Sequence, residues 1–178
     1  AVDWLLLDAL QHVSGQAPEP APDLRSAELA HYFRLTTRVI DQEPFTRARD
    51  RMGEAVLRRQ VLAGAYVLVD GRERVAEADA RIPAVHLVTA GSVVPEVLAA
   101  AEELAEEGVI ANVIDVPTPG RFYRAWQRTL RQAVRTATTP SLPGTLRAVM
   151  AQRAPIVSVH DSASHSFAWL GSALGVAQ

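Results

Sequence analysis

Apolar residues from about residue 64 to the end of the chain form short continuous runs separated by amphipathic stretches. Four runs have the length of a strand and cover residues 65–69, 84–89, 109–116 and 155–160. Runs that are apolar at nearly every position are typical of strands buried on both faces of a parallel sheet. The pattern predicts an α/β domain with a mostly parallel sheet and helices on both faces. Besides the stretch after the second run, helices are expected over residues 121–135, 142–152 and 166–174.

The amphipathic stretch between the second and third runs predicts a helix that links two parallel strands. Its apolar face consists of Val94, Val97, Leu98, Ala101, Leu104 and Ala105, and its acidic face of Glu102, Glu103, Glu106 and Glu107. Ser92 is placed to cap the N-terminus of this helix, Pro95 lies in its first turn and Gly108 ends it. We therefore expect strands 84–89 and 109–116 to be parallel neighbours with a right-handed crossover.

The first part of the chain contains too few elements to enclose a core of its own. A helix is expected over residues 2–13, where Asp3 can cap the first turn, and a strand over residues 31–37, which are rich in aromatic and β-branched types. A Pro- and Ala-rich loop at 16–23 lies between them. Because both faces of a lone strand need covering, we interpret residues 1–45 as the tail of another α/β domain.

The Arg-rich stretch from Glu43 to Leu62 predicts a polar helix on the surface, interrupted by Gly53. This gives three parts: residues 1–45 end one domain, residues 46–63 form a linker helix, and residues 64–178 form a second domain. The chain stops just after an apolar segment, where a further strand is expected. The second domain is therefore expected to be truncated.

Composition and charge exclude several classes of protein. The 178 residues contain no Cys, which excludes disulfides, thiolate metal sites and a thiol nucleophile. All 18 basic residues are Arg, so a Schiff-base lysine and a Walker phosphate loop are excluded as well. A net charge of −2 does not favour nucleic-acid binding. No apolar run is long enough for a membrane span, and no signal-peptide pattern begins at Ala1, so we expect a soluble cytoplasmic protein.

The loop that follows the fourth apolar run carries the best candidates for chemistry. It contains His160, Asp161, Ser162, Ser164 and His165 at the carboxyl end of an expected strand, where ligands of open α/β sheets bind. These residues could form an acid–base pair or a polar site at a cleft or interface. Loop capping and dimer packing are the alternative. Adjacent His and Asp side chains point in different directions and no third ligand is evident, so no metal site is predicted.

Other polar residues allow both a functional and a structural interpretation. Arg34 lies within the expected strand 31–37 and Arg38 follows it directly, and an arginine inside a sheet needs an ionic partner, a subunit boundary or a ligand. Gly91 and Ser92 could hold an anion at a helix N-terminus, but capping alone explains Ser92. His86, inside an apolar strand, is interpreted as a structural histidine.

Several stretches resemble known families. Residues 85–108, VHLVTAGSVVPEVLAAAEELAEEG, resemble the second strand and first helix of the transketolase C-terminal domain, and residues 111–118, ANVIDVPT, are similar to its next strand. Residues 30–38, AHYFRLTTR, and 156–172, IVSVHDSASHSFAWLGS, resemble the homodimeric pyruvate dehydrogenase component. On this resemblance, residues 1–45 correspond to the end of the pyrimidine-binding middle domain. Residues from about 64 then correspond to most of the transketolase C-terminal-like domain.

The resemblance implies a parent enzyme that uses thiamin diphosphate and Mg. In that family the thiazolium ylid attacks the 2-keto carbon of pyruvate, carbon dioxide leaves, and the acetyl unit passes to lipoamide. The family's Gly-Asp-Gly motif does not occur in this sequence and its catalytic glutamate would lie upstream of Ala1, so no catalytic residue and no cofactor are expected in this segment alone. The segment would serve as a structural and dimerisation lobe. Its partners would be a second copy, the rest of the enzyme and a lipoyl acyltransferase core.

Other interpretations remain open at this stage. Transketolases and deoxyxylulose phosphate synthases share this C-terminal fold, so a fragment of either enzyme is the alternative to the pyruvate dehydrogenase interpretation. A free-standing assembly module of the same fold is an interpretation from a different class, and a small-molecule binding domain of flavodoxin-like shape is a third.

Overall fold

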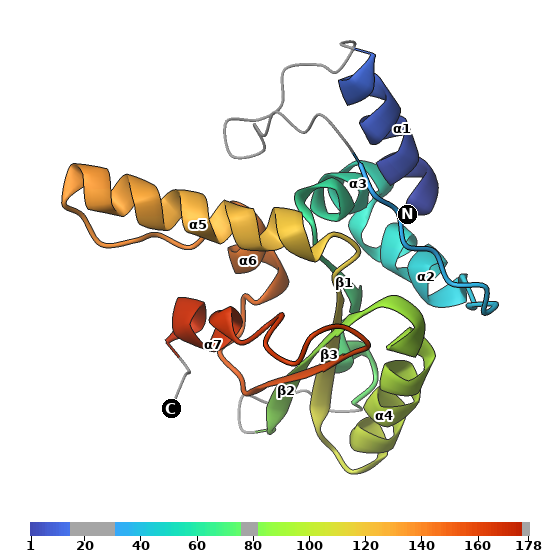
Figure 1. The fold of residues 1–178 in the computed structure, drawn as a ribbon. Helices are drawn as coiled ribbons and strands as arrows, with labels where there is room; N and C mark the ends of the chain where they lie inside the picture. Colours follow the sequence, from blue (N-terminus) through green and yellow to red (C-terminus); the bar gives the residue numbers. More distant parts are fainter. Residues whose placement is uncertain (15–30, 76–81, 176–178) are drawn as a thin grey trace.

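The computed structural model describes residues 1–14, 31–75 and 82–175 (Figure 1). Its helices are α1 (Val2–Val13), α2 (Glu43–Met52), α3 (Glu54–Ala63), α4 (Val94–Glu106), α5 (Pro119–Thr136), α6 (Gly144–Val149) and α7 (Trp169–Leu174), with short 3-10 turns η1 (Gly71–Glu73) and η2 (Gly91–Val93). Its strands are β1 (Tyr66–Val69), β2 (Ala84–Ala90), β3 (Ile110–Asp115) and β4 (Ile156–His160). The expected loop at 16–23 lies outside the described residues.

The described strands form one sheet in the order β1-β3-β2-β4. Strand β2 pairs in parallel with β3 and with β4, which confirms the expected parallel neighbours and the α/β class. Strand β1 pairs with β3 in the antiparallel direction, and the register shifts between Val67 and Val69. The prediction that the fourth apolar run is a buried strand is wrong. Strand β4 has one strand neighbour among the described residues, so Val157 and Val159 remain 48% and 37% exposed.

Alternation along the strands divides the interior into two cores, one on each face of the sheet. Leu87 and Val113 belong to the α4-side core, which also includes residues of α3 and α4. Val88 and Ile114, one position further along, belong to the α5-side core with residues of α5, α6 and α7. The sheet is therefore covered by helices on both faces, as the apolar runs predicted.

The Arg-rich stretch forms two helices rather than one. Gly53, with φ +80°, separates α2 from α3 in a backbone conformation that L side chains rarely adopt. Leu57 and Val61 lie four residues apart on one face of α3 and are fully buried in the α4-side core. The expectation of a surface helix is therefore wrong for this face, because one leucine and one valine side chain among the arginines bury it in the core.

The predicted strand over residues 31–37 is also wrong. Residues 31–42 contain neither a helix nor a strand. A strand needs a neighbour for its backbone groups, and the described sheet includes no strand paired with this segment. Phe33 packs against the α4-side core, whereas Tyr32 is 89% exposed. The aromatic and β-branched residues at 31–37 thus lie in a segment without regular secondary structure, which side-chain contacts hold against the rest of the protein.

The N-terminal helix α1 is confirmed, although Asp3 does not cap it: the cap position is Ala1, without a side-chain hydrogen bond. One face of α1 is buried through Leu5 and Ala9, and α1 lies beside α3 (Figure 1). Trp4 is half-buried against the α4-side core, and the exposed apolar side chains of α1 are Val2, Leu6, Leu7, Leu10 and Val13. Across the described ranges, we find no helix with the length and hydropathy needed to cross a membrane.

Candidate functional site

A cleft of about 900 Å³ lies at the carboxyl ends of β2 and β3. Its lining includes the starts of α4 and α5, the end of β3 and the beginning of the loop after β4. Segment 31–42 contributes much of another wall. This is the edge of a parallel sheet at which ligands of α/β proteins bind. The cleft therefore lies where the sequence placed the candidate loop.

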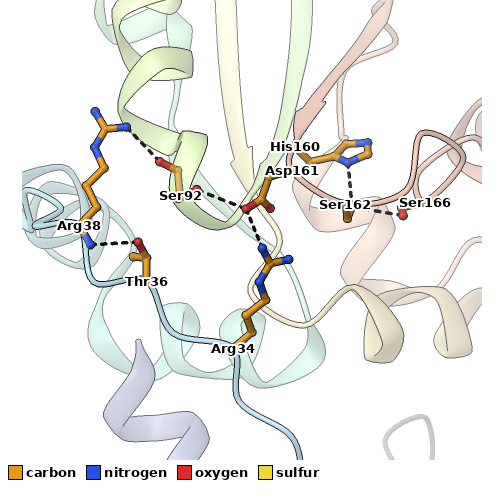
Figure 2. A network of polar contacts seen from close by, with 8 residues as sticks. All are labelled: Arg34, Thr36, Arg38, Ser92, His160, Asp161, Ser162 and Ser166. Carbon is orange, nitrogen blue, oxygen red and sulfur yellow. Dashed lines mark hydrogen bonds and ion pairs between the residues drawn. The ribbon is translucent and has the colours of Figure 1, made fainter.

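Asp161 joins three segments that are far apart in the sequence. Its Oδ2 accepts hydrogen bonds from Arg34 Nη2 and from Ser92 Oγ, each at 3.3 Å (Figure 2). Gly91, with φ +81°, allows this approach, since a Cβ at that position would lie 2.9 Å from Oδ1 of Asp161. Asp161 thus ties segment 31–42 to the end of β4 and the start of α4.

The prediction that Ser92 caps the following helix is wrong. The residue at the N-cap position of α4 is Val93, and no side chain caps the helix there. A 3-10 turn at 91–93 precedes α4, so the Ser92 hydroxyl is free to donate to Asp161 instead. Pro95 does lie in the first turn of α4, as predicted.

Arg38 fastens segment 31–42 to α4. Its Nη1 donates to Glu96 Oε1 at 2.5 Å and to the Ser92 carbonyl at 3.4 Å. The hydrogen bond from Arg38 lowers the pKa of Glu96. The backbone N–H of Arg38 also donates to Thr36 Oγ1 at 3.0 Å, which shapes the turn in the segment (Figure 2). Both arginines that were singled out in the sequence therefore have acidic partners across the cleft wall.

His160, at the end of β4, and Asp161, directly after it, point in different directions, as the sequence predicted for adjacent residues (Figure 2). His160 Nδ1 lies 2.7 Å from Ser162 Oγ, and Ser162 donates to Ser166 Oγ at 3.2 Å. The His160 ring packs edge-on against Phe167, with centroids 4.9 Å apart. This arrangement orders the loop, and it brings Ser162 but not the His160 ring to the cleft.

Ser164 and His165 do not join this group. Both are exposed, and neither is among the residues that line the cleft. The loop turns between Ala163 and Ser166, where Ser166 N donates to the Ala163 carbonyl at 2.9 Å. This turn carries the second histidine away from the first.

One acid of the cleft was not predicted from the sequence: Asp115, which is half-buried at the last position of β3. Tyr66 lies opposite Asp115 in the β1–β3 register and hydrogen-bonds to its carboxyl. Burial raises the pKa of Asp115 from 3.8 to about 6, although the Tyr66 hydrogen bond acts in the lowering direction. Burial likewise raises the pKa of Tyr66. A lone carboxyl that ends an apolar strand, just before Pro117, was the signal that could have revealed it.

Arg121 and Arg124, on the first turns of α5, also line the cleft. Arg121 Nη2 lies 2.8 Å from Asp8 Oδ2, in an ion pair whose side chains are each 16% exposed. Arg121 Nη1 also donates to the Leu62 carbonyl at 3.2 Å. The pair connects α1 to α5 beside the cleft, which Arg121 lines.

His86 occupies a structural position away from the cleft. It is 3% exposed, and its Nε2 lies 2.7 Å from the Gln152 carbonyl. Burial lowers the pKa of His86. Within the described parts of the chain, no group of three or more His, Asp or Glu side chains is arranged to hold a metal ion.

Comparison with known families adds one finding. The family model for the transketolase C-terminal domain matches residues 75–140, the part of the chain that contains β2, α4, β3 and α5. A search of curated proteins gives no match. The four-stranded α/β arrangement is consistent with a transketolase C-terminal-like fold.

Proposed function

We propose that this chain is part of a thiamin-diphosphate-dependent 2-keto-acid dehydrogenase of the pyruvate dehydrogenase type, in which it serves as a structural and dimerisation lobe. The observation that carries the proposal is the β2–α4–β3 unit, which pairs in parallel and lies within the match to the transketolase C-terminal domain. The resemblance of residues 30–38 and 156–172 to the pyruvate dehydrogenase component supports the narrower assignment.

Exposed apolar surface supports the role as a lobe. Leu10 and Val13 on α1 are 66% and 67% exposed, and β4 presents Val157 and Val159. Clustered apolar side chains of this kind mark surfaces on which protein packs. We propose that these surfaces are covered by a second copy and by the remainder of the enzyme, and that a lipoyl acyltransferase core is a further partner of the assembly.

The residues of this chain do not fit the cofactor of the proposed parent enzyme. The Gly-Asp-Gly motif that holds the metal and diphosphate in that family does not occur in the sequence. The acids that line the cleft, Asp41, Asp115 and Asp161, do not form a metal-binding group in the structure. We therefore assign thiamin diphosphate and Mg to other parts of the proposed enzyme.

The match to the transketolase C-terminal domain favours a second candidate as well. Transketolase-like and deoxyxylulose phosphate synthase-like enzymes share this domain, and so would a non-catalytic assembly module. The gene sequence upstream of Ala1 distinguishes these proposals. A Gly-Asp-Gly motif followed by an asparagine supports an enzyme, and a start codon close to Ala1 supports the assembly module.

Calorimetric titration of residues 1–178 with thiamin diphosphate and Mg tests the proposed role directly. We expect no heat of binding, and no pyruvate decarboxylation by the same sample. Sedimentation at micromolar concentration should show a dimer, and Leu10→Asp should weaken it if α1 contributes to the interface. Tight cofactor binding would overturn the role as a supporting lobe, and a monomer in sedimentation would overturn the dimerisation part.

A further inference from the structure

Segment 31–42 runs along the cleft without forming a helix or a strand. Residues 31–37 and 40–42 line the cleft, opposite Leu98 on α4 and Thr118 at the start of α5. Tyr32, Leu35 and Val39 are 89%, 62% and 93% exposed, so most of the segment's side chains are not packed into a core. The cleft therefore has one rigid side, built by the sheet and its helices, and one side built by a segment outside the regular structure.

Two arginines attach this segment to the rigid side. Arg34 reaches Asp161, and Arg38 reaches the Ser92 carbonyl (Figure 2). Arg38 also forms an ion pair with Glu96. The two guanidinium groups are exposed, with 68% and 50% of the side-chain surface accessible. Exposed ion pairs are weak and are screened by salt. The two ion pairs therefore hold segment 31–42 at a defined place on the rigid side, but they break at a low cost in free energy.

We propose that segment 31–42 is a strap that closes the cleft, and that Arg34 and Arg38 are its two releasable fastenings. Asp161 is suited to this role because it also accepts from Ser92, which holds the carboxylate in place when Arg34 leaves. Opening needs no change in the sheet, because the segment has no strand pairing to break. An open strap would expose Tyr66 and Asp115, which line the cleft.

The inference is independent of the proposed function, since it concerns access to the cleft and not the identity of a ligand. The strap places no side chain fully inside a core: Phe33 is half-buried against the α4-side core, His31 is half-buried beside the His12 ring, and Ile40 is half-buried in the cleft wall. In contrast, α3 places Leu57 and Val61 fully inside that core. The strap can thus detach at its arginines while α2 and α3 stay in place.

The absence of cysteine from the chain allows a direct test with single thiols. Leu98→Cys and Thr118→Cys place one thiol at each end of the rigid side, and the Thr118 hydroxyl that the second replaces is buried without a hydrogen-bond partner. The rate of reaction of each thiol with a small maleimide measures how often the cleft is open. We expect Arg34→Gln combined with Arg38→Gln to raise the rate about tenfold in each of the two single-cysteine proteins. Each exposed ion pair shifts the equilibrium between the closed and the open strap by roughly two- to fivefold.

Controls separate strap opening from local or global effects. Arg47→Gln removes another exposed ion pair, with Glu43 on α2, and should leave both rates unchanged. Val134→Cys on α5, at a position that is 83% exposed, should react fast in every background. Unfolding curves establish that each variant is folded. The strap is supported if both thiols react faster in the double arginine variant and if added salt has the same effect in the single-cysteine proteins that keep both arginines. A rate change of less than twofold, or a change at Leu98→Cys alone, overturns it.

Discussion

Replacing Asp115 with asparagine should stabilise the folded chain at neutral pH and leave its stability in acid nearly unchanged. Asp115 is a half-buried carboxyl at the end of β3, and its partial removal from water raises its pKa from 3.8 to about 6. The folded state therefore holds the proton more tightly than the unfolded state does. Asparagine is neutral at every pH, has nearly the same shape, and can still accept a hydrogen bond from Tyr66.

The sign of the effect follows from the order of the two pKa values. Below about pH 4 both states are protonated, and the Asp115 carboxyl does not change the free energy of unfolding. Between about pH 4 and 6 the unfolded state loses its proton first, so stability falls as pH rises. Above about pH 6 the loss is complete, and a difference of about two in pKa corresponds to roughly 3 kcal/mol. Because the pKa of about 6 already includes the lowering effect of the Tyr66 hydrogen bond, the expected gain for Asp115→Asn at neutral pH is about 2–3 kcal/mol.

Urea unfolding followed by circular dichroism, at several values between about pH 4 and 8, measures this gain. The difference between Asp115→Asn and the parent should grow through that range and level off above about pH 7. Asp41→Asn is the matched control, because Asp41 also lines the cleft but is exposed to water. A difference that does not depend on pH, or one that favours the parent at neutral pH, would refute the burial argument.

Two further predictions concern packing and charge, and unfolding free energies test both. A Cβ at Gly71 would lie 2.6 Å from the backbone N and O of Ala111, so Gly71→Ala should lower the free energy of unfolding by about 2–4 kcal/mol. Gly144→Ala is the control: this position has open space around it, so the substitution should be neutral or raise that free energy by up to about 1 kcal/mol. Equal effects of the two would contradict the close approach of η1 to β3. Asp8→Asn should lower stability by about 1–2 kcal/mol, because it leaves the half-buried Arg121 without its carboxylate. Unchanged stability would show that this pair does not hold α1.

The elements with a strong apolar periodicity could be predicted from the sequence, because the pattern within each stretch shows which of its faces is buried. The acidic and apolar faces of α4, between two apolar runs, specified the parallel pair β2 and β3. The same reasoning failed for β4 and for residues 31–37. An apolar run does not reveal whether a strand is central or at an edge, and β-type composition does not supply a pairing partner.

The candidate site was predictable in its location but not in its contacts. The rule that ligands bind beyond the carboxyl ends of parallel strands placed His160 and Asp161 at the correct edge of the sheet. The pairing of Arg34 with Asp161 joins positions 127 residues apart, and no local pattern contains that information. For Ser92 the local pattern was misleading: it predicted a helix cap, but the hydroxyl donates to Asp161, which lies far away in the sequence.

The two outer strands of the sheet differ in how open they are to further pairing. Arg51 donates to the Val67 carbonyl at 2.7 Å, and the irregular register of β1 bends that strand, whereas β4 presents valines on an otherwise regular strand. Charged side chains and bulges at an outer strand hinder the addition of another chain. Growth of the sheet by successive copies needs two receptive sides, and among the strands that the structure describes β4 is the one of this kind. Backbone association through β4 would therefore form a symmetric pair of molecules rather than a growing fibre.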